Sequence, residues 1–141
     1  MGLVNNQKAY DRYLLNQESG SNIIIHGERI GFSFEIRMPN FRGNYLSCIE
    51  ELIITVNDRV VDEKTIELCL NGKRFAIHEL SELYKEYWDV LDFARIEVFR
   101  EGGLTGMHRI GVTMRLRYGY SAYFGVCKVV TSKCEKPLSF D

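Results

Sequence analysis

Metal-ligating residues are scarce in this sequence of 141 residues. It has 3 His and 4 Cys, and no two cysteines form a C-x-x-C pair. Zinc sites usually take their ligands from such short spacings, so we expect no metal or cofactor in this chain. A chain of this length also needs no disulfide to fold. Reduced thiols, buried or half-buried, are expected at all four cysteines, which are Cys48, Cys69, Cys127 and Cys134.

The sequence also lacks an excess of charge and any long apolar run. Its 18 basic side chains nearly balance 19 acidic ones, which argues against nucleic acid or an anionic membrane as the main partner. No run approaches the ~18 apolar residues of a transmembrane helix, and the segment from Met1 to Leu15 lacks the apolar core of a signal peptide. We therefore expect a cytoplasmic protein that binds neither nucleic acid nor membrane.

Short alternating segments, separated by turn residues, make up most of the chain. Their apolar and polar residues repeat with the period of two that half-buried strands show. On the longest such segment, Ile110, Val112, Met114 and Leu116 share one face. Three consecutive isoleucines, 23 to 25, predict a strand covered on both faces. Strands are predicted over 22–26, 30–38, 51–57, 60–61, 94–100, 107–118 and 126–131.

A hairpin and one short helix complete the predicted fold. The hairpin covers 65–77, where Asn71-Gly72 supplies the two positive-φ positions of a type I′ turn. Apolar residues at helical offsets predict a short helix over 79–84 and an extended segment over 86–91, or alternatively a longer helix through Leu91. We predict one mainly-β domain over residues 1–141, an antiparallel β-sandwich with a single short helix.

Titratable residues do not form a known catalytic pattern. His108 falls by parity on the apolar face of its strand. It is either a catalytic base or, more simply, a strand-end histidine whose hydrogen bonds are satisfied. Glycosidases need two carboxyl groups at a defined separation, and the neighbours Glu50 and Glu51 would point to opposite faces of a strand. No catalytic residue is therefore predicted in this chain.

Three arginines form a basic stripe along one face of the last long strand. They are Arg109, Arg115 and Arg117. We expect this stripe to be solvated and balanced by acids on neighbouring strands, such as Glu35 or Glu97. A surface for a partner is the alternative.

The segment from Pro39 to Cys48, which we call the 39–48 loop, has the most unusual composition. Pro39 has no backbone N–H, so strand pairing should stop near it. Phe41, Arg42 and Tyr45 follow within a few residues, and Arg and Tyr are enriched at binding hot spots. Gly43 lets the backbone approach a neighbour closely or adopt a positive φ. The loop either contacts a partner or ligand, or packs on its own domain.

The same loop carries a resemblance to a known family. The pattern Arg37-x-Pro39-x-Phe41-Arg42-Gly43-x-x-Leu46-Ser47-Cys48-x-Glu50 resembles the small (β) subunit of bacterial C-glycoside deglycosidases. The similarity runs from about Asn22 to Arg117. It includes the strand through Val56, the Asn71-Gly72 turn, the run His78-Glu79-Leu80 and the strand from Gly106.

The resemblance implies an accessory subunit that is not active alone. In this family a larger α subunit, similar to the sugar-isomerase barrels, holds a divalent metal, typically manganese, and the catalytic base. The complex is a lyase-type enzyme acting on 3-oxo-C-glycosides, in which the carbonyl acidifies the proton at C2 and elimination breaks the carbon–carbon bond to the aglycone. This chain would brace the barrel and wall its active-site entrance. The residues expected at that interface are Arg37, Pro39, Phe41, Arg42, Gly43, Tyr45 and Ser47.

Two other functions remain open from the sequence. One is a stand-alone carbohydrate-binding sandwich, with Phe41, Tyr45 and Trp88 as a sugar platform. The other is a self-sufficient enzyme that uses His108. The sequence does not choose the aglycone, the stoichiometry or the metal.

Overall fold

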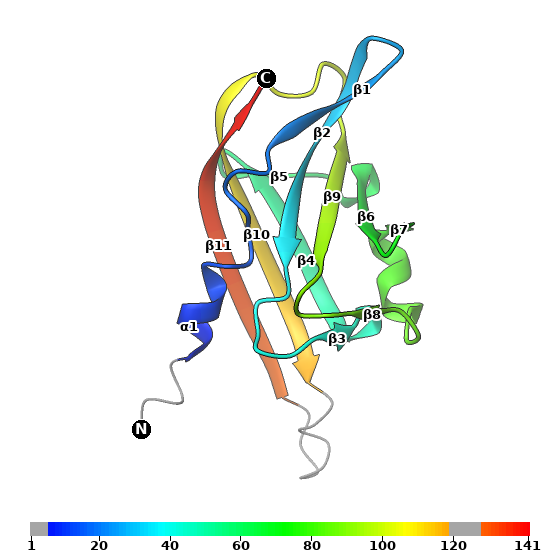
Figure 1. Ribbon diagram of the computed structural model, residues 1–141, viewed down its shortest axis with the longest axis vertical. Helices are drawn as coiled ribbons and strands as arrows, with labels where there is room; N and C mark the ends of the chain where they lie inside the picture. The colour runs from blue at the N-terminus through cyan, green and yellow to red at the C-terminus, as the bar shows by residue number, and fades with distance from the viewer. Residues whose placement is uncertain (1–5, 119–127) are drawn as a thin grey trace.

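The computed structural model describes residues 6–118 and 128–141, and its strands form two main antiparallel sheets (Figure 1). The five-stranded sheet has the order β1 (Ser21–Ile25), β2 (Glu28–Arg37), β9 (Phe93–Phe99), β6 (Ile66–Leu70) and β7 (Lys73–Ala76). The four-stranded sheet has the order β11 (Lys128–Phe140), β10 (Gly106–Tyr118), β4 (Ile49–Val56) and β5 (Arg59–Val60). A separate two-stranded ribbon pairs β3 (Asn44–Tyr45) with β8 (Tyr87–Trp88). The predicted mainly-β antiparallel fold is confirmed.

The core is built from the inward face of each strand. The predicted face of β10 is buried, with Ile110 and Met114 fully so. Opposite strands contribute Phe32 and Phe34 from β2 and Ile96 from β9. Phe32 also meets the ring of Phe140, 5.5 Å away and edge to face, a favoured aromatic geometry. The period of two therefore placed the core correctly on the central strands.

The prediction that Ile23, Ile24 and Ile25 are covered on both faces is wrong. Ile24 is 59% exposed and Ile25 50% exposed. Strand β1 is the edge of its sheet and pairs only with β2, with a register shift between Ile23 and Ile24. The tip of the β1–β2 hairpin extends beyond the rest of the sandwich (Figure 1), so the described residues leave Ile24 and Ile25 largely exposed.

The last strand is longer than predicted. Strand β11 runs from Lys128 to Phe140 and pairs with the whole of β10, whereas the sequence predicted only 126–131, of which 126 and 127 lie outside the described residues. Charged residues and Pro137 hide this strand from a pattern analysis. Because β11 is an edge strand, it tolerates a proline that lacks a donor.

The turns and helices follow the sequence more closely. Asn71 and Gly72 have φ values of 54° and 76°, so the predicted hairpin is confirmed. The short helix is a 3-10 helix, η4 (Ile77–Glu82), which begins two residues earlier than predicted. The alternative longer helix is wrong, because β8 begins at Tyr87 and pairs with β3. The remaining helices are α1 (Asn6–Asp11), η2 (Leu46–Cys48) and η3 (Glu63–Thr65). Among the described helices, none has the length and hydrophobicity to cross a membrane.

Candidate functional site

The 39–48 loop leaves the sheet where the sequence predicts. The last residue pair between β2 and β9 is Arg37 with Phe93, and Pro39 follows directly after Met38. Met38, Pro39 and Asn40 are buried, and the Asn40 side chain accepts a hydrogen bond from the Phe41 N–H. The chain therefore turns outward on a buried base, and the residues after Asn40 reach the surface.

Gly43 is required by a close approach of two backbones. A Cβ atom at this position would lie 2.3 Å from the carbonyl oxygen of Trp88 and 2.7 Å from the Tyr87 hydroxyl. Gly43 is not among the glycines with positive φ, so only the first of its two predicted roles applies. The approach allows Asn44 and Tyr45 to pair with β8.

Further contacts fix the loop to the four-stranded sheet and to η4. The Asn44 amide donates to the Arg117 carbonyl at 3.0 Å. The Arg117 guanidinium in turn donates to the Ser47 carbonyl at 3.3 Å and pairs with Glu50 at 3.0 Å. The Ser47 N–H donates to the Leu83 carbonyl. These contacts tie the second half of the loop, at Asn44 and Ser47, to the rest of the domain.

Several exposed apolar residues belong to the segments that lead into β3, β8 and β9, and β3 and β8 lie at one end of the sandwich (Figure 1). Phe41 is 60% exposed and Tyr45 44% exposed. We call this surface the aromatic end and define it by five exposed residues, which are Phe41, Tyr45, Tyr87, Leu91 and Phe93. Exposed apolar residues that cluster in this way are typical of protein interaction sites.

Neighbouring side chains orient the rings of the aromatic end. The Tyr45 and Tyr87 rings meet edge to face with centroids 5.1 Å apart. The Arg37 guanidinium lies over the Phe93 ring, 4.3 Å from its centroid, and the Arg42 guanidinium lies 5.4 Å from the Phe41 centroid. These contacts favour cation–π attraction and restrict the rings before binding.

The seven residues predicted for the interface therefore divide into three groups by exposure. Phe41, Arg42 and Tyr45 are exposed, whereas Pro39 is buried and shapes the loop. The other three are half-buried, and these are Arg37, Gly43 and Ser47. Sequence analysis missed Tyr87, Leu91 and Phe93, whose only signal was several large apolar residues in a segment predicted to be extended.

The geometry removes part of the sugar-platform alternative. Trp88 is fully buried, and its indole N–H donates to the Asp92 carbonyl at 2.9 Å. It cannot stack on a sugar. Tyr45 and Tyr87 are inclined at 75° to each other, so this pair offers no flat surface for a pyranose ring.

His108 has partners for both ring nitrogens. Its Nε2 lies 2.9 Å from the Thr105 carbonyl oxygen, which can only accept, so Nε2 carries a proton. Its Nδ1 lies 3.0 Å from the Asn57 Nδ2 and accepts from it. The Asn57 Oδ1 accepts from the Arg109 N–H, which fixes the amide orientation. This is the satisfied strand-end histidine that the sequence analysis favoured.

Two of the three arginines in the basic stripe pair with acids on neighbouring segments, although not with Glu35 or Glu97. Arg109 pairs with Asp58 and with Glu135, and Arg117 pairs with Glu50. Glu35 and Glu97 belong to the five-stranded sheet, on a different layer from β10. The solvated interpretation fits these pairs, and the named partners Glu35 and Glu97 were wrong.

Buried charge is concentrated on the outer face of the five-stranded sheet. Glu97 is 2% exposed and pairs with Arg74 and Arg95. Burial raises the pKa of the nearby Cys69 thiol, and the charge of Glu97 raises it further. A hydrogen bond to Glu97 raises the pKa of Arg74. Cys48, Cys69 and Cys134 are free thiols; Cys127 lies outside the described residues.

No group of three or more His, Cys, Asp or Glu side chains is arranged to hold a metal ion within residues 6–118 and 128–141. The described part of the chain thus offers no ligand set for a divalent cation. Its distinctive feature is a set of exposed aromatic side chains next to the paired strands β3 and β8.

Comparisons with known proteins point to one family. The profile of the family described as C-glycoside deglycosidase beta subunit matches residues 10–120. The chain is 29% identical over 96 residues to the C-glycoside deglycosidase beta subunit of Eubacterium cellulosolvens, covering 67% of this chain and 61% of that protein. It is 33% identical over 93 residues to the 3'-dehydrocarminate deglycosidase beta subunit of a Microbacterium species, covering 64% of this chain and 68% of that protein.

A third relative gives the same picture over a shorter region. The C-glycoside deglycosidase beta subunit of Arthrobacter globiformis is 28% identical over 72 residues, covering 51% of this chain and 53% of that protein. The chain thus spans between about half and two thirds of each relative. The family match includes both the 39–48 loop and β8, and it covers well over half of the 141 residues. The chain therefore belongs to the C-glycoside deglycosidase beta subunit family.

Proposed function

We propose that this chain is the accessory β subunit of a hetero-oligomeric C-glycoside deglycosidase and that its aromatic end binds a larger, barrel-fold α subunit. Its relatives are named as β subunits, a name that presupposes another subunit. The observation that carries the proposal is the set of exposed rings, among them Phe41 and Tyr45, held on a base of backbone pairing.

Burial of apolar rings and preorganisation of the loop both favour binding of a partner at the aromatic end. Each apolar ring left in water forgoes ~25 cal/mol per Å² of burial, and covering the rings of the aromatic end recovers that free energy. Because the loop is already fixed by Gly43, Asn44 and Ser47, little conformational entropy is lost on binding. Arg42 can add a bidentate contact to a carboxylate of the partner, which a lysine could not reproduce.

The chemistry belongs to the α subunit in this proposal. The substrate would be a 3-oxo-C-glycoside, whose carbonyl acidifies the neighbouring C2 proton before elimination of the aglycone. The divalent metal, typically manganese, and the catalytic base would sit in the barrel. This chain would brace that barrel and wall its substrate entrance, in the cytoplasm.

Reconstitution tests the proposal. The tagged chain is purified from its native host, the co-purifying larger subunit is identified, and turnover of a 3-oxo-C-glucoside is measured for each subunit and for the mixture. We expect turnover by the complex and none by this chain alone. Turnover by this chain alone, or a stoichiometric transition metal on elemental analysis of it, would contradict the accessory role.

A further inference from the structure

A second candidate site lies at the opposite end of the sandwich from the aromatic end. A cavity of about 670 Å³ opens between the two sheets, where β4, β5 and β9 end and β10 begins. This volume is within the range of small-molecule sites. We call it the inter-sheet cavity and define it by its apolar floor of Phe32, Val56, Val61 and Val98 and its polar wall of Arg59, Arg100, Asn57 and His108.

The floor of the inter-sheet cavity is part of the hydrophobic core. Phe32 is fully buried and Val98 nearly so, and Val61 packs against the same core from the partly buried shell. The accessible part of the floor comes from Val61, which is half-buried, and from Val56, which is 8% exposed. A ligand with an apolar body would cover these two valines, whereas a small hydrated ion would leave them in contact with water.

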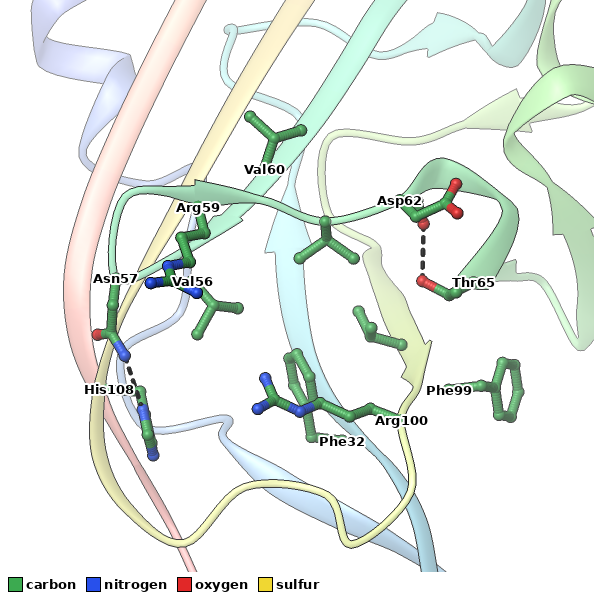
Figure 2. Close-up of a pocket in the computed structure, with 12 residues that line it drawn as sticks. Phe32, Val56, Asn57, Arg59, Val60, Asp62, Thr65, Phe99, Arg100 and His108 are labelled. Atoms are coloured by element: carbon green, nitrogen blue, oxygen red, sulfur yellow. Dashed lines mark hydrogen bonds between the residues drawn. The ribbon is translucent and has the colours of Figure 1, made fainter.

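Two arginines enter the cavity from different sheets. Arg59 lies on β5 and Arg100 directly follows β9, and Figure 2 shows the Arg59 side chain beside Val56 and Asn57 and the Arg100 side chain beside Phe32. Neither guanidinium makes an ion pair or a side-chain hydrogen bond within residues 6–118 and 128–141. By contrast, Arg74, Arg109 and Arg117 all pair with acids.

The other polar groups of the wall do not supply the missing negative charge. Asp62 is the only acid that lines the cavity among the described residues. Its carboxylate accepts the Lys64 N–H at the start of η3, and Figure 2 shows it turned away from the two guanidinium groups. His108 and Asn57 are occupied with each other. The two arginines therefore face the cavity as a pair of positive charges without an acid.

We propose that the inter-sheet cavity binds a small organic carboxylate with an apolar, ring-sized body. The carboxylate would lie between the forks of Arg59 and Arg100, which match its planar geometry. The ring would cover Val56 and Val61 and shield them from water. This inference does not rest on the proposed assembly, because the cavity and the aromatic end lie at opposite ends of the molecule.

Titration of the purified chain with benzoate and 2-naphthoate tests the site. The neutral amides of both acids remove the charge but keep the ring, and inorganic phosphate keeps charge but removes the ring. We expect one site per chain, with NMR shifts at Arg59, Arg100 and His108. Each amide should bind about tenfold or more weakly than its parent acid, because it loses a charge-assisted hydrogen bond. Phosphate should bind about tenfold or more weakly than either acid, because it has no ring.

Variants locate the binding. Arg59→Gln and Arg100→Gln should each weaken carboxylate binding about tenfold or more, with the melting curve confirming an intact fold. Arg115→Gln is the matched control, because Arg115 is also an exposed arginine but lies outside the cavity, and it should bind like the wild type. Equal binding of acids and amides, wild-type affinity in both cavity variants, or no binding of either acid up to about 10 mM would overturn the proposal.

Discussion

The two ends of the sandwich expose opposite kinds of chemistry. At the aromatic end, rings such as Phe41 and Tyr45 stand out from a fixed base. At the other end, Arg59 and Arg100, both exposed, line a cavity that has an apolar floor. A convex apolar surface gains most by burial against a macromolecule, whereas a concave site with convergent charges suits a small ligand. The comparison shows that one small fold can place an exposed apolar surface at one end and a concave, positively charged cavity at the other.

The largest loss of stability is expected from a substitution at Gly43, where the base of the aromatic end has its closest backbone contact. Gly43→Ala forces a Cβ atom to within 2.3 Å of the Trp88 carbonyl oxygen, a backbone atom. We expect a loss of about 2–3 kcal/mol in the free energy of unfolding, typical of strong overpacking, measured by denaturant titration. Carboxylate binding at the other end should persist in the folded fraction.

Gly111 is a matched control for Gly43, because an added Cβ atom meets a neighbour at the same distance at both positions. Gly111→Ala also places a Cβ atom 2.3 Å from a neighbour, but that neighbour is the Thr55 hydroxyl, which can rotate away. Its cost should be clearly smaller. Equal losses in the two variants would show that the backbone contact at Gly43 is not what fixes the loop.

Removing exposed side chains should affect assembly and not the fold. Arg42→Ala and Tyr45→Ala are each expected to weaken binding of the α subunit by ~1–3 kcal/mol, as hot-spot residues do. Their melting temperatures alone should stay close to that of the wild type, because both side chains are exposed. Titration against the α subunit and a melting curve of each variant measure the two quantities.

Either of two results would contradict the predicted role of Arg42 and Tyr45 in assembly. Wild-type affinity in both variants would remove the 39–48 loop from the interface. A collapsed melting temperature would show that Arg42 and Tyr45 serve the fold rather than a partner. Arg59→Gln provides the opposite-end control, since it should leave the affinity for the α subunit unchanged.

The turn between β6 and β7 lies outside the aromatic end but is hydrogen-bonded to it. Gly72 has a φ of 76°, and the Asn71 side chain donates to the Tyr87 carbonyl at 3.1 Å. Gly72→Val should destabilise the fold by roughly 1–2 kcal/mol or more, because β-branched residues are strained at positive φ. Gly72→Asn should be tolerated far better. Unchanged thermal stability of the valine variant would contradict the type I′ turn.

The smallest effect concerns a thiol between the two ends. Because burial and then the charge of Glu97 raise the pKa of Cys69 above its ordinary value of 9.0, its alkylation should reach half its maximal rate at a higher pH than that of a free cysteine. The folded state then keeps the proton that the unfolded state loses, so stability should fall as pH rises through this range. A half-maximal alkylation rate at the pH expected for a free cysteine would contradict the raised pKa of Cys69.

Sequence patterns predicted the parts of the fold that depend on local rules. Alternation identified the buried faces of β2, β9 and β10, and Asn71-Gly72 identified its hairpin because few residue pairs accept two positive φ values. The failures at Ile24 and in β11 share one cause. Whether a strand lies at a sheet edge depends on its neighbours in space, and neither hydrophobicity nor charge along the chain records that.

The two candidate sites also differ in how much of each could be predicted from the sequence. Pro39 and the rings after it made the 39–48 loop stand out, so Phe41, Arg42 and Tyr45 could be named as candidate interface residues. Tyr87 lies opposite Tyr45 only through the β3–β8 pairing, and Phe93 lies opposite Arg37 through the β2–β9 pairing. Arg59 and Arg100 gave no signal, because their approach depends on how the ends of two sheets meet.

Hydrogen exchange of this chain with and without the α subunit tests the central claim most directly. Burial of the aromatic end should slow amide exchange in peptides that cover residues 39–48 and 84–93, which include the exposed rings. Peptides covering 57–65 and 99–108, around the inter-sheet cavity, should exchange as in the free chain. Protection of the cavity peptides with no change at 39–48 and 84–93 would contradict the account.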